Sequence, residues 1–67
     1  ESPQHLQEAV ELAATANHWR GMTYERAGRP RAARDAYRAA RQEWRKLPDT
    51  GGAAGEATAE RLAELER

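Results

Sequence analysis

The chain has 67 residues, which is long enough for one small domain. Its formal net charge is zero at neutral pH and it has no cysteine. The missing cysteine excludes disulfides and thiolate metal sites, and the balanced charge argues against a general nucleic-acid binder. No stretch is apolar enough for a membrane span or a signal peptide, so we expect a cytoplasmic protein with no membrane partner.

The hydrophobic inventory is thin for an independent fold. Beside fifteen Ala there are five Leu, one Val, one Met, two Trp and two Tyr, with neither Ile nor Phe. A chain of this size buries only ~60% of its unfolded surface, and each Ala contributes little apolar area. We therefore expect stabilisation by a homodimer, a protein partner or additional chain, with a modestly stable monomer as the alternative.

The first predicted helix covers residues 3–27. Ser2 is suited to cap it and Pro3 to its first turn, and Gly21 is the one interior residue that disfavours it. Two mostly apolar stripes at helical spacing lie on different faces. The first stripe contains Leu6, Ala9, Val10, Ala13, Asn17, Gly21, Tyr24 and Ala27, and the second contains Leu12, Ala16, Trp19 and Thr23. We expect one stripe to meet the second helix and the other to meet the third, with a partner-facing Trp19 as the alternative.

Gly28-Arg29-Pro30 predicts the end of one helix and the immediate start of the next. So short a connection makes the two helices antiparallel neighbours. The second helix is predicted over residues 30–47, ending before Pro48. Its apolar face contains Ala33, Ala36, Tyr37, Ala40, Trp44 and Leu47. We expect four of these, Ala33, Tyr37, Ala40 and Trp44, to pack on Val10, Ala13, Gly21 and Tyr24.

Residues 48–52 predict a flexible turn, and residues 53–66 a third helix with Ala59, Leu62 and Leu65 as its apolar side. Gly55 weakens the start of this helix, where we expect fraying. No segment alternates with the period of a strand. The predicted fold class is all-α, an antiparallel helical hairpin with a short C-terminal helix. Residues 1–67 form a single domain, standing alone or within a longer protein.

Five arginines follow a second face of the middle helix at three- and four-residue steps: Arg31, Arg34, Arg38, Arg41 and Arg45. Residues 25–46 contain eight basic and three acidic residues (net +5), whereas three acidic and one basic residue (net −2) precede them and five acidic and two basic residues (net −3) follow. Three interpretations stay open. The stripe is a solvated face with local ion pairs, or it pairs with the acidic third helix within a molecule or across a dimer, or it binds nucleic acid.

The two-helix unit resembles a tetratricopeptide (TPR) repeat over residues 14–48. The resemblance is carried by Gly21-x-x-Tyr24, by Gly28 at the turn, by Ala33-x-x-x-Tyr37 and Ala40, and by Pro48 after the second helix. It implies a scaffold that binds peptides or proteins in a groove lined by the first helix, at Thr15, His18, Met22, Glu25 and Arg26. His18 and Met22 stand where the family's carboxylate clamp has Lys and Asn, so that recognition mode is not expected. The architecture is also similar to three-helix microtubule-interacting and trafficking (MIT) domains.

Catalytic and metal-binding patterns are missing. His5 and His18 are thirteen residues apart with no H-E-x-x-H spacing, Ser2 is the single serine, and Gly51-Gly52 lacks the Lys of a phosphate loop. We therefore expect no enzyme activity, metal, cofactor or small-molecule substrate.

The sequence favours a non-catalytic protein–protein interaction or assembly module that binds a protein, a peptide or a second copy of itself. The candidate contact residues are Thr15, His18, Trp19, Met22, Glu25 and Arg26, together with Arg31, Arg34, Arg38, Arg41 and Arg45. The second hypothesis is a nucleic-acid-binding domain that uses the five arginines. The third is a structural segment of a larger regulator or enzyme.

Overall fold

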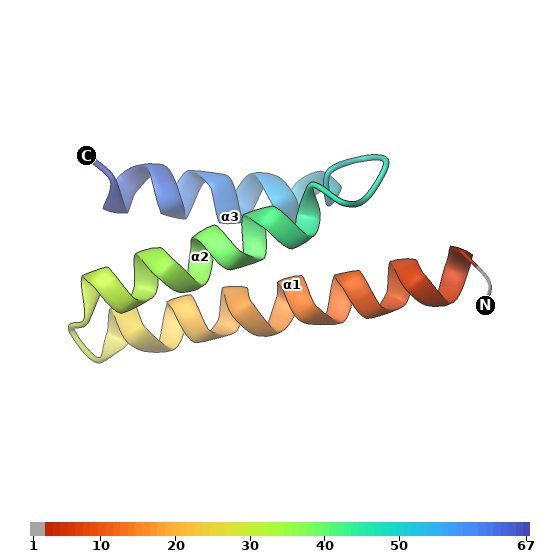
Figure 1. Ribbon diagram of the computed structural model, residues 1–67. Helices are drawn as coiled ribbons and strands as arrows, with labels where there is room; N and C mark the ends of the chain where they lie inside the picture. Colours follow the sequence, from red (N-terminus) through yellow and green to blue (C-terminus); the bar gives the residue numbers. More distant parts are fainter. Residues whose placement is uncertain (1–2) are drawn as a thin grey trace.

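The computed structural model describes residues 3–67 and contains three helices, α1 (Pro3–Arg26), α2 (Pro30–Trp44) and α3 (Gly52–Leu65). No strand occurs within these residues, so the predicted all-α class is confirmed. α2 lies between the other two helices and runs antiparallel to both (Figure 1). The molecule is elongated, about 40 Å in its longest dimension. The predicted cap at Ser2 falls outside the described residues.

The turn between α1 and α2 is built as the sequence predicts. Gly28 has a φ of +72°, in the left-handed region where glycine carries no steric penalty. The Gly28 amide donates to the Glu25 carbonyl and the Arg29 amide to the Tyr24 carbonyl. This pair of bonds closes the helix in a Schellman motif, one residue before the predicted end. Pro30 then begins α2, where its missing amide hydrogen costs nothing.

The seam between α1 and α2 depends on small residues. A Cβ atom on Gly21 would lie 2.7 Å from Cε1 of Tyr37, so glycine alone lets the tyrosine ring lie flat against α1. Ala33, Tyr37 and Ala40 are fully buried, as expected. The expectation for Ala13 is wrong, because Ala14 is the fully buried residue that packs with Ala40, Trp44 and Leu47, while Ala13 is half-buried. The other three predicted contacts of α1 hold, since Val10 and Tyr24 pack against the core and Gly21 lies under Tyr37.

The second helix ends at Trp44, three residues before the predicted Leu47. The amides of Lys46 and Leu47 bond to carbonyls three residues back, which tightens the chain out of the α-helix. This tightening directs Leu47 into the core with Trp44 and Val10, and Pro48 prevents the helix from resuming. In the turn that follows, Thr50, Gly51 and Gly52 have positive φ angles, in the left-handed region. This turn reverses the chain so that the third helix can pack against α2.

The third helix begins one residue before its predicted start and docks through Leu62 and Leu65, as expected, but with Thr58 in place of the predicted Ala59. Leu62 and Thr58 are fully buried and Leu65 is half-buried, but Ala59 is exposed. Gly55 is buried, and a Cβ atom there would collide with the backbone carbonyl of Thr50. The glycine expected only to weaken this helix is therefore what allows α3 to approach the preceding turn.

Candidate functional site

A shallow groove runs between α1 and α3, with α2 as its floor. Four of the five residues to which the TPR resemblance assigns a groove line it: His18, Met22, Glu25 and Arg26. Thr15, the fifth, is exposed but lies outside the lining. The floor is Tyr37, and α3 contributes Ala57, Glu60 and Arg61, which the sequence did not single out. The α3 residues were missed because their place opposite α1 depends on how α3 docks.

The polar groups of this groove are bonded mainly to one another. The Tyr37 hydroxyl donates to Oε1 of Glu25 at 2.6 Å, and the Arg61 guanidinium forms an ion pair with the same carboxylate. Hydrogen bonding from Arg61 holds the pKa of Glu25 below its usual 4.5. Burial, reinforced by the Glu25 bond, raises the pKa of Tyr37 to about 12. Glu25 therefore links all three helices and stays ionised at neutral pH.

A second polar contact ties the helices together at the buried hydroxyl of Thr58. Its Oγ1 atom accepts a bond from Nε1 of Trp44 at 3.0 Å and lies 3.2 Å from the Ala54 carbonyl, to which it donates. Nδ1 of His18 lies 2.9 Å from the same oxygen. Because the hydroxyl has one hydrogen, this arrangement is satisfied when His18 carries its proton on Nδ1. Burial lowers the pKa of His18 below its usual 6.5, which favours the neutral ring.

The face of α1 opposite α2 is uncovered. Leu12 is 72% exposed and Trp19 is 57% exposed, and Ala16 and Thr23 on the same face are also exposed. The expectation that this stripe meets the third helix is wrong, since α3 reaches α1 on the side of His18 and Glu25. The alternative, that Trp19 faces a partner, remains a prediction.

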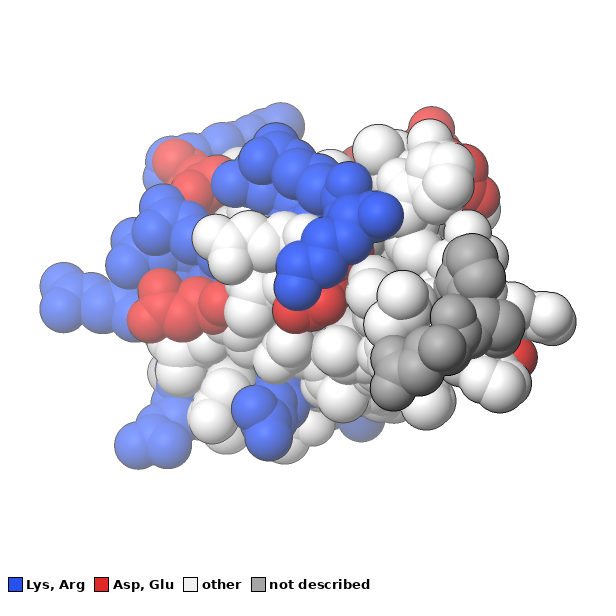
Figure 2. Space-filling view, turned by 45° about the vertical axis from the view of Figure 1, so that its right-hand side comes forward, with Lys and Arg blue, Asp and Glu red and all other residues white. Residues whose placement is uncertain are grey.

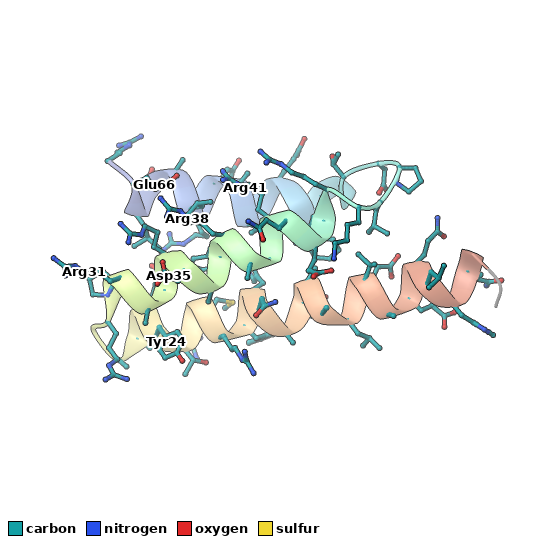
Figure 3. The ribbon with its side chains drawn as sticks, in the orientation of Figure 1. Tyr24, Arg31, Asp35, Arg38, Arg41 and Glu66 are labelled. Atoms are coloured by element: carbon teal, nitrogen blue, oxygen red, sulfur yellow. The ribbon has the colours of Figure 1, made fainter. Side chains whose placement is uncertain are left out.

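The five arginines of α2 divide between paired and unpaired guanidinium groups. Arg38 donates to Glu66, the residue that follows α3, at 2.6 Å, and Arg34 lies 3.7 Å from Asp35. Figure 3 shows Arg38 and Arg41 on the side of α2 that faces α3, and Arg31 at the start of α2. Within residues 3–67 no carboxylate lies within 4 Å of the remaining three, Arg31, Arg41 and Arg45.

The stems of these arginines contribute to packing as well as to charge. The Nε atoms of Arg34 and Arg41 are buried without a hydrogen-bond partner, although both side chains reach the surface. Basic side chains gather toward one side of the molecule in Figure 2, with acidic ones interspersed. The structure thus combines two of the three interpretations of the stripe. Arg38 pairs with Glu66 at the end of α3, Arg34 lies beside Asp35, and Arg31 and Arg45 are exposed to solvent.

The described residues show no arrangement typical of a metal site, since no three His, Asp or Glu side chains gather among them. No helix in this part of the chain combines the length and the apolar character needed to cross a bilayer.

Comparisons with protein-family models, with curated proteins and with solved structures give no match for this chain. Three surfaces of the chain are candidates for binding a partner: the groove between α1 and α3, the arginine stripe of α2, and the uncovered face of α1.

Proposed function

We propose that this chain is a non-catalytic protein–protein interaction or assembly module whose contact surface is the uncovered face of α1. The observation that carries the proposal is the exposure of two large apolar side chains, Leu12 and Trp19, two helical turns apart on one face. Burying such side chains against a partner is favourable, and Trp is enriched where protein interfaces have most of their binding energy.

The uncovered face is a better contact surface than the groove. A ligand entering the groove must compete with bonds already made among Glu25, Tyr37 and Arg61. Each broken bond leaves a polar group to be satisfied again. On the uncovered face nothing has to be broken, since only water leaves Leu12 and Trp19. The TPR resemblance, which implies protein binding, supports this proposal, and the proposed location of the protein is the cytoplasm.

The proposal is tested by sedimenting the tagged protein that contains this chain in an extract of its own cells. The wild type should sediment faster than expected for the monomeric protein. Trp19→Glu and Leu12→Glu should each lower the sedimentation rate to that of the monomer, because a charge on this face opposes burial against a partner. Gln42→Glu, on the exposed surface of α2, is the control and should sediment like the wild type. Helix content measured by circular dichroism should be the same in all four proteins. Unchanged sedimentation of Trp19→Glu would contradict the proposal.

Nucleic-acid binding is the second candidate, favoured by the three unpaired arginines of α2, Arg31, Arg41 and Arg45. Guanidinium groups without carboxylate partners are available for phosphates. Its test is retention of the chain on duplex DNA and on RNA at rising salt. Binding that weakens steeply with salt, and that the double variant Arg31→Gln/Arg45→Gln reduces, supports this candidate. Absence of retention at low salt removes it.

A further inference from the structure

The uncovered face of α1 has a charge at each end. Glu8 and Arg26 are eighteen residues apart, which is five helical turns, so they share one angular position about 27 Å apart. Both are exposed, and neither forms an ion pair within residues 3–67. Leu12 and Trp19 lie between them. We call this strip, from Glu8 to Arg26 through Leu12, Ala16, Trp19 and Thr23, the outer face of α1.

An outer face that is acidic at one end and basic at the other is complementary to a copy of itself that runs in the opposite direction. Antiparallel pairing with residue 17 at its centre places Glu8 of each copy opposite Arg26 of the other, so that two ion pairs form around a two-fold axis. Parallel pairing places like charges together and is disfavoured.

The same register matches large apolar side chains with small ones. In this register Trp19 of one copy lies level with residue 15 of the other, and Leu12 with residue 22. The outer-face residues nearest to them are therefore Ala16 and Thr23, each one residue farther along the helix. A large side chain against a small one lets two helices approach closely and pack without a void. Neither Ala16 nor Thr23 is needed inside the monomer, because both are exposed in it.

From this complementarity of charge and size, we infer that the partner bound by the outer face is a second copy of this chain, paired antiparallel along α1. The inference rests on the proposed function and names its partner. Pairing would also bury Leu12 and Trp19, which the monomer leaves exposed to water. This additional apolar burial would stabilise a small chain whose core is mostly alanine.

The test is sedimentation velocity of the purified chain over a range of concentrations from micromolar to millimolar at low salt. The wild type should form a dimer in proportion to concentration, and emission from Trp19 should shift to shorter wavelength as the dimer forms, while the buried Trp44 gives a constant background. Glu8→Arg and Arg26→Glu should each weaken the dimer about tenfold or more, because each places like charges opposite one another.

The double variant Glu8→Arg/Arg26→Glu is the decisive protein. It reverses the polarity of the outer face and should restore the dimer to within a few-fold of the wild type, which a general loss of stability cannot produce. Gln42→Arg, which adds a positive charge to α2, is the matched control and should dimerise like the wild type. High salt should weaken the wild type and the double variant alike.

The inference is overturned if the purified wild type is monomeric at every concentration, if the single variants dimerise normally, or if the double variant is not restored. The outcome for the proposed function is separate. If the purified chain is monomeric but its assembly in the cell extract still depends on Trp19, the partner is a different protein, and the proposed interaction module stands. If assembly in the extract does not depend on Trp19, both the proposed function and the self-pairing are wrong.

Discussion

The two interfaces of α2 are built on different principles. Toward α1, α2 presents Ala33, Tyr37 and Ala40, and the contact is closed by the glycine under the tyrosine ring. Toward α3, the contact includes the Thr58 hydroxyl bonded to Trp44, with an ion pair between Arg38 and Glu66. The first interface depends mainly on shape and burial, which are insensitive to pH and salt, and has one hydrogen bond to a charged group, from Tyr37 to Glu25. The second relies more on hydrogen bonds and charges, so α3 should be the helix that responds most to solution conditions.

The largest expected effect tests the interface of shape. Ala33→Glu places a carboxylate at a fully buried position, in a cluster with Tyr37 and Leu62. Burying such a charge costs several kcal/mol, comparable with the whole stability of a small domain, so the chain should be unfolded at room temperature. Circular dichroism measures the loss of helix. Ala63→Glu, at an exposed position of α3, is the control, and an Ala33→Glu variant with native helix content would contradict the packing described for the hairpin.

A smaller effect is expected where α3 docks through hydrogen bonds. Thr58→Val keeps the shape of the side chain but leaves Nε1 of Trp44 and Nδ1 of His18 without their acceptor. An unsatisfied buried donor costs about 1–3 kcal/mol, and the urea midpoint should fall accordingly. Thr58→Ser keeps the hydroxyl and should be closer to the wild type. Equal stability of the valine and serine variants would show that packing alone positions α3.

The difference between the interfaces also explains which features the sequence could predict. The hairpin follows from local signals, namely Gly28 and Pro30 at the turn and the spacing of Ala33, Tyr37 and Ala40, and the structure has all of them in the expected places. One contact residue was wrong, Ala13 in place of Ala14, because the pattern of an Ala-rich helix does not distinguish between two neighbouring alanines.

The docking of α3 could not be predicted in the same way. Thr58 meets His18 across forty residues of sequence, and no local pattern reports such a pairing. From the sequence alone, Thr58 is expected on the exposed side of a short helix, and Gly55 is expected to destabilise its start. The need for glycine at position 55 becomes visible only with the close approach of the Thr50 carbonyl. Since the side of α1 that α3 covers was unknown, the sequence could not predict that Leu12 and Trp19 stay exposed. For the candidate site, it identified four groove residues of α1 and none of α3.

Acidification should weaken the attachment of α3 in two stages. The pKa of His18 is lowered by burial, so between that value and 6.5 the unfolded chain binds a proton that the folded chain does not, and the free energy of unfolding falls as the pH decreases below 6.5. The pKa of Glu25 is lowered by Arg61, so its contribution is complete above 4.5 and is lost at lower pH. Urea titrations from pH 7.5 to pH 3.5 measure both stages.

The two stages can be assigned by substitution. His18→Asn keeps an amide donor for Thr58 but cannot titrate, so it should remove the stage below 6.5 and leave the stage below 4.5. Glu25→Gln should do the opposite, and it should also lower the stability at neutral pH, because the ion pair with Arg61 is gone. A stability that stays constant between pH 7.5 and pH 5 in the wild type would contradict the burial of His18.

The smallest effect is expected at the far end of α3, where Arg38 pairs with Glu66. Both side chains are partly exposed, at 46% and 34%, so water and salt screen the pair. Glu66→Gln should lower the urea midpoint slightly at low salt and leave it unchanged at high salt. Arg38 holds the pKa of Glu66 below its usual 4.5. In Arg38→Gln the pKa of Glu66, measured from the carboxyl carbon signal in an NMR titration, should therefore rise toward 4.5. A loss in Glu66→Gln as large as that in Thr58→Val would mean that the ion pair, and not the buried hydroxyl, holds α3 in place. The arginine stripe would then be part of the fold and less available to any phosphate.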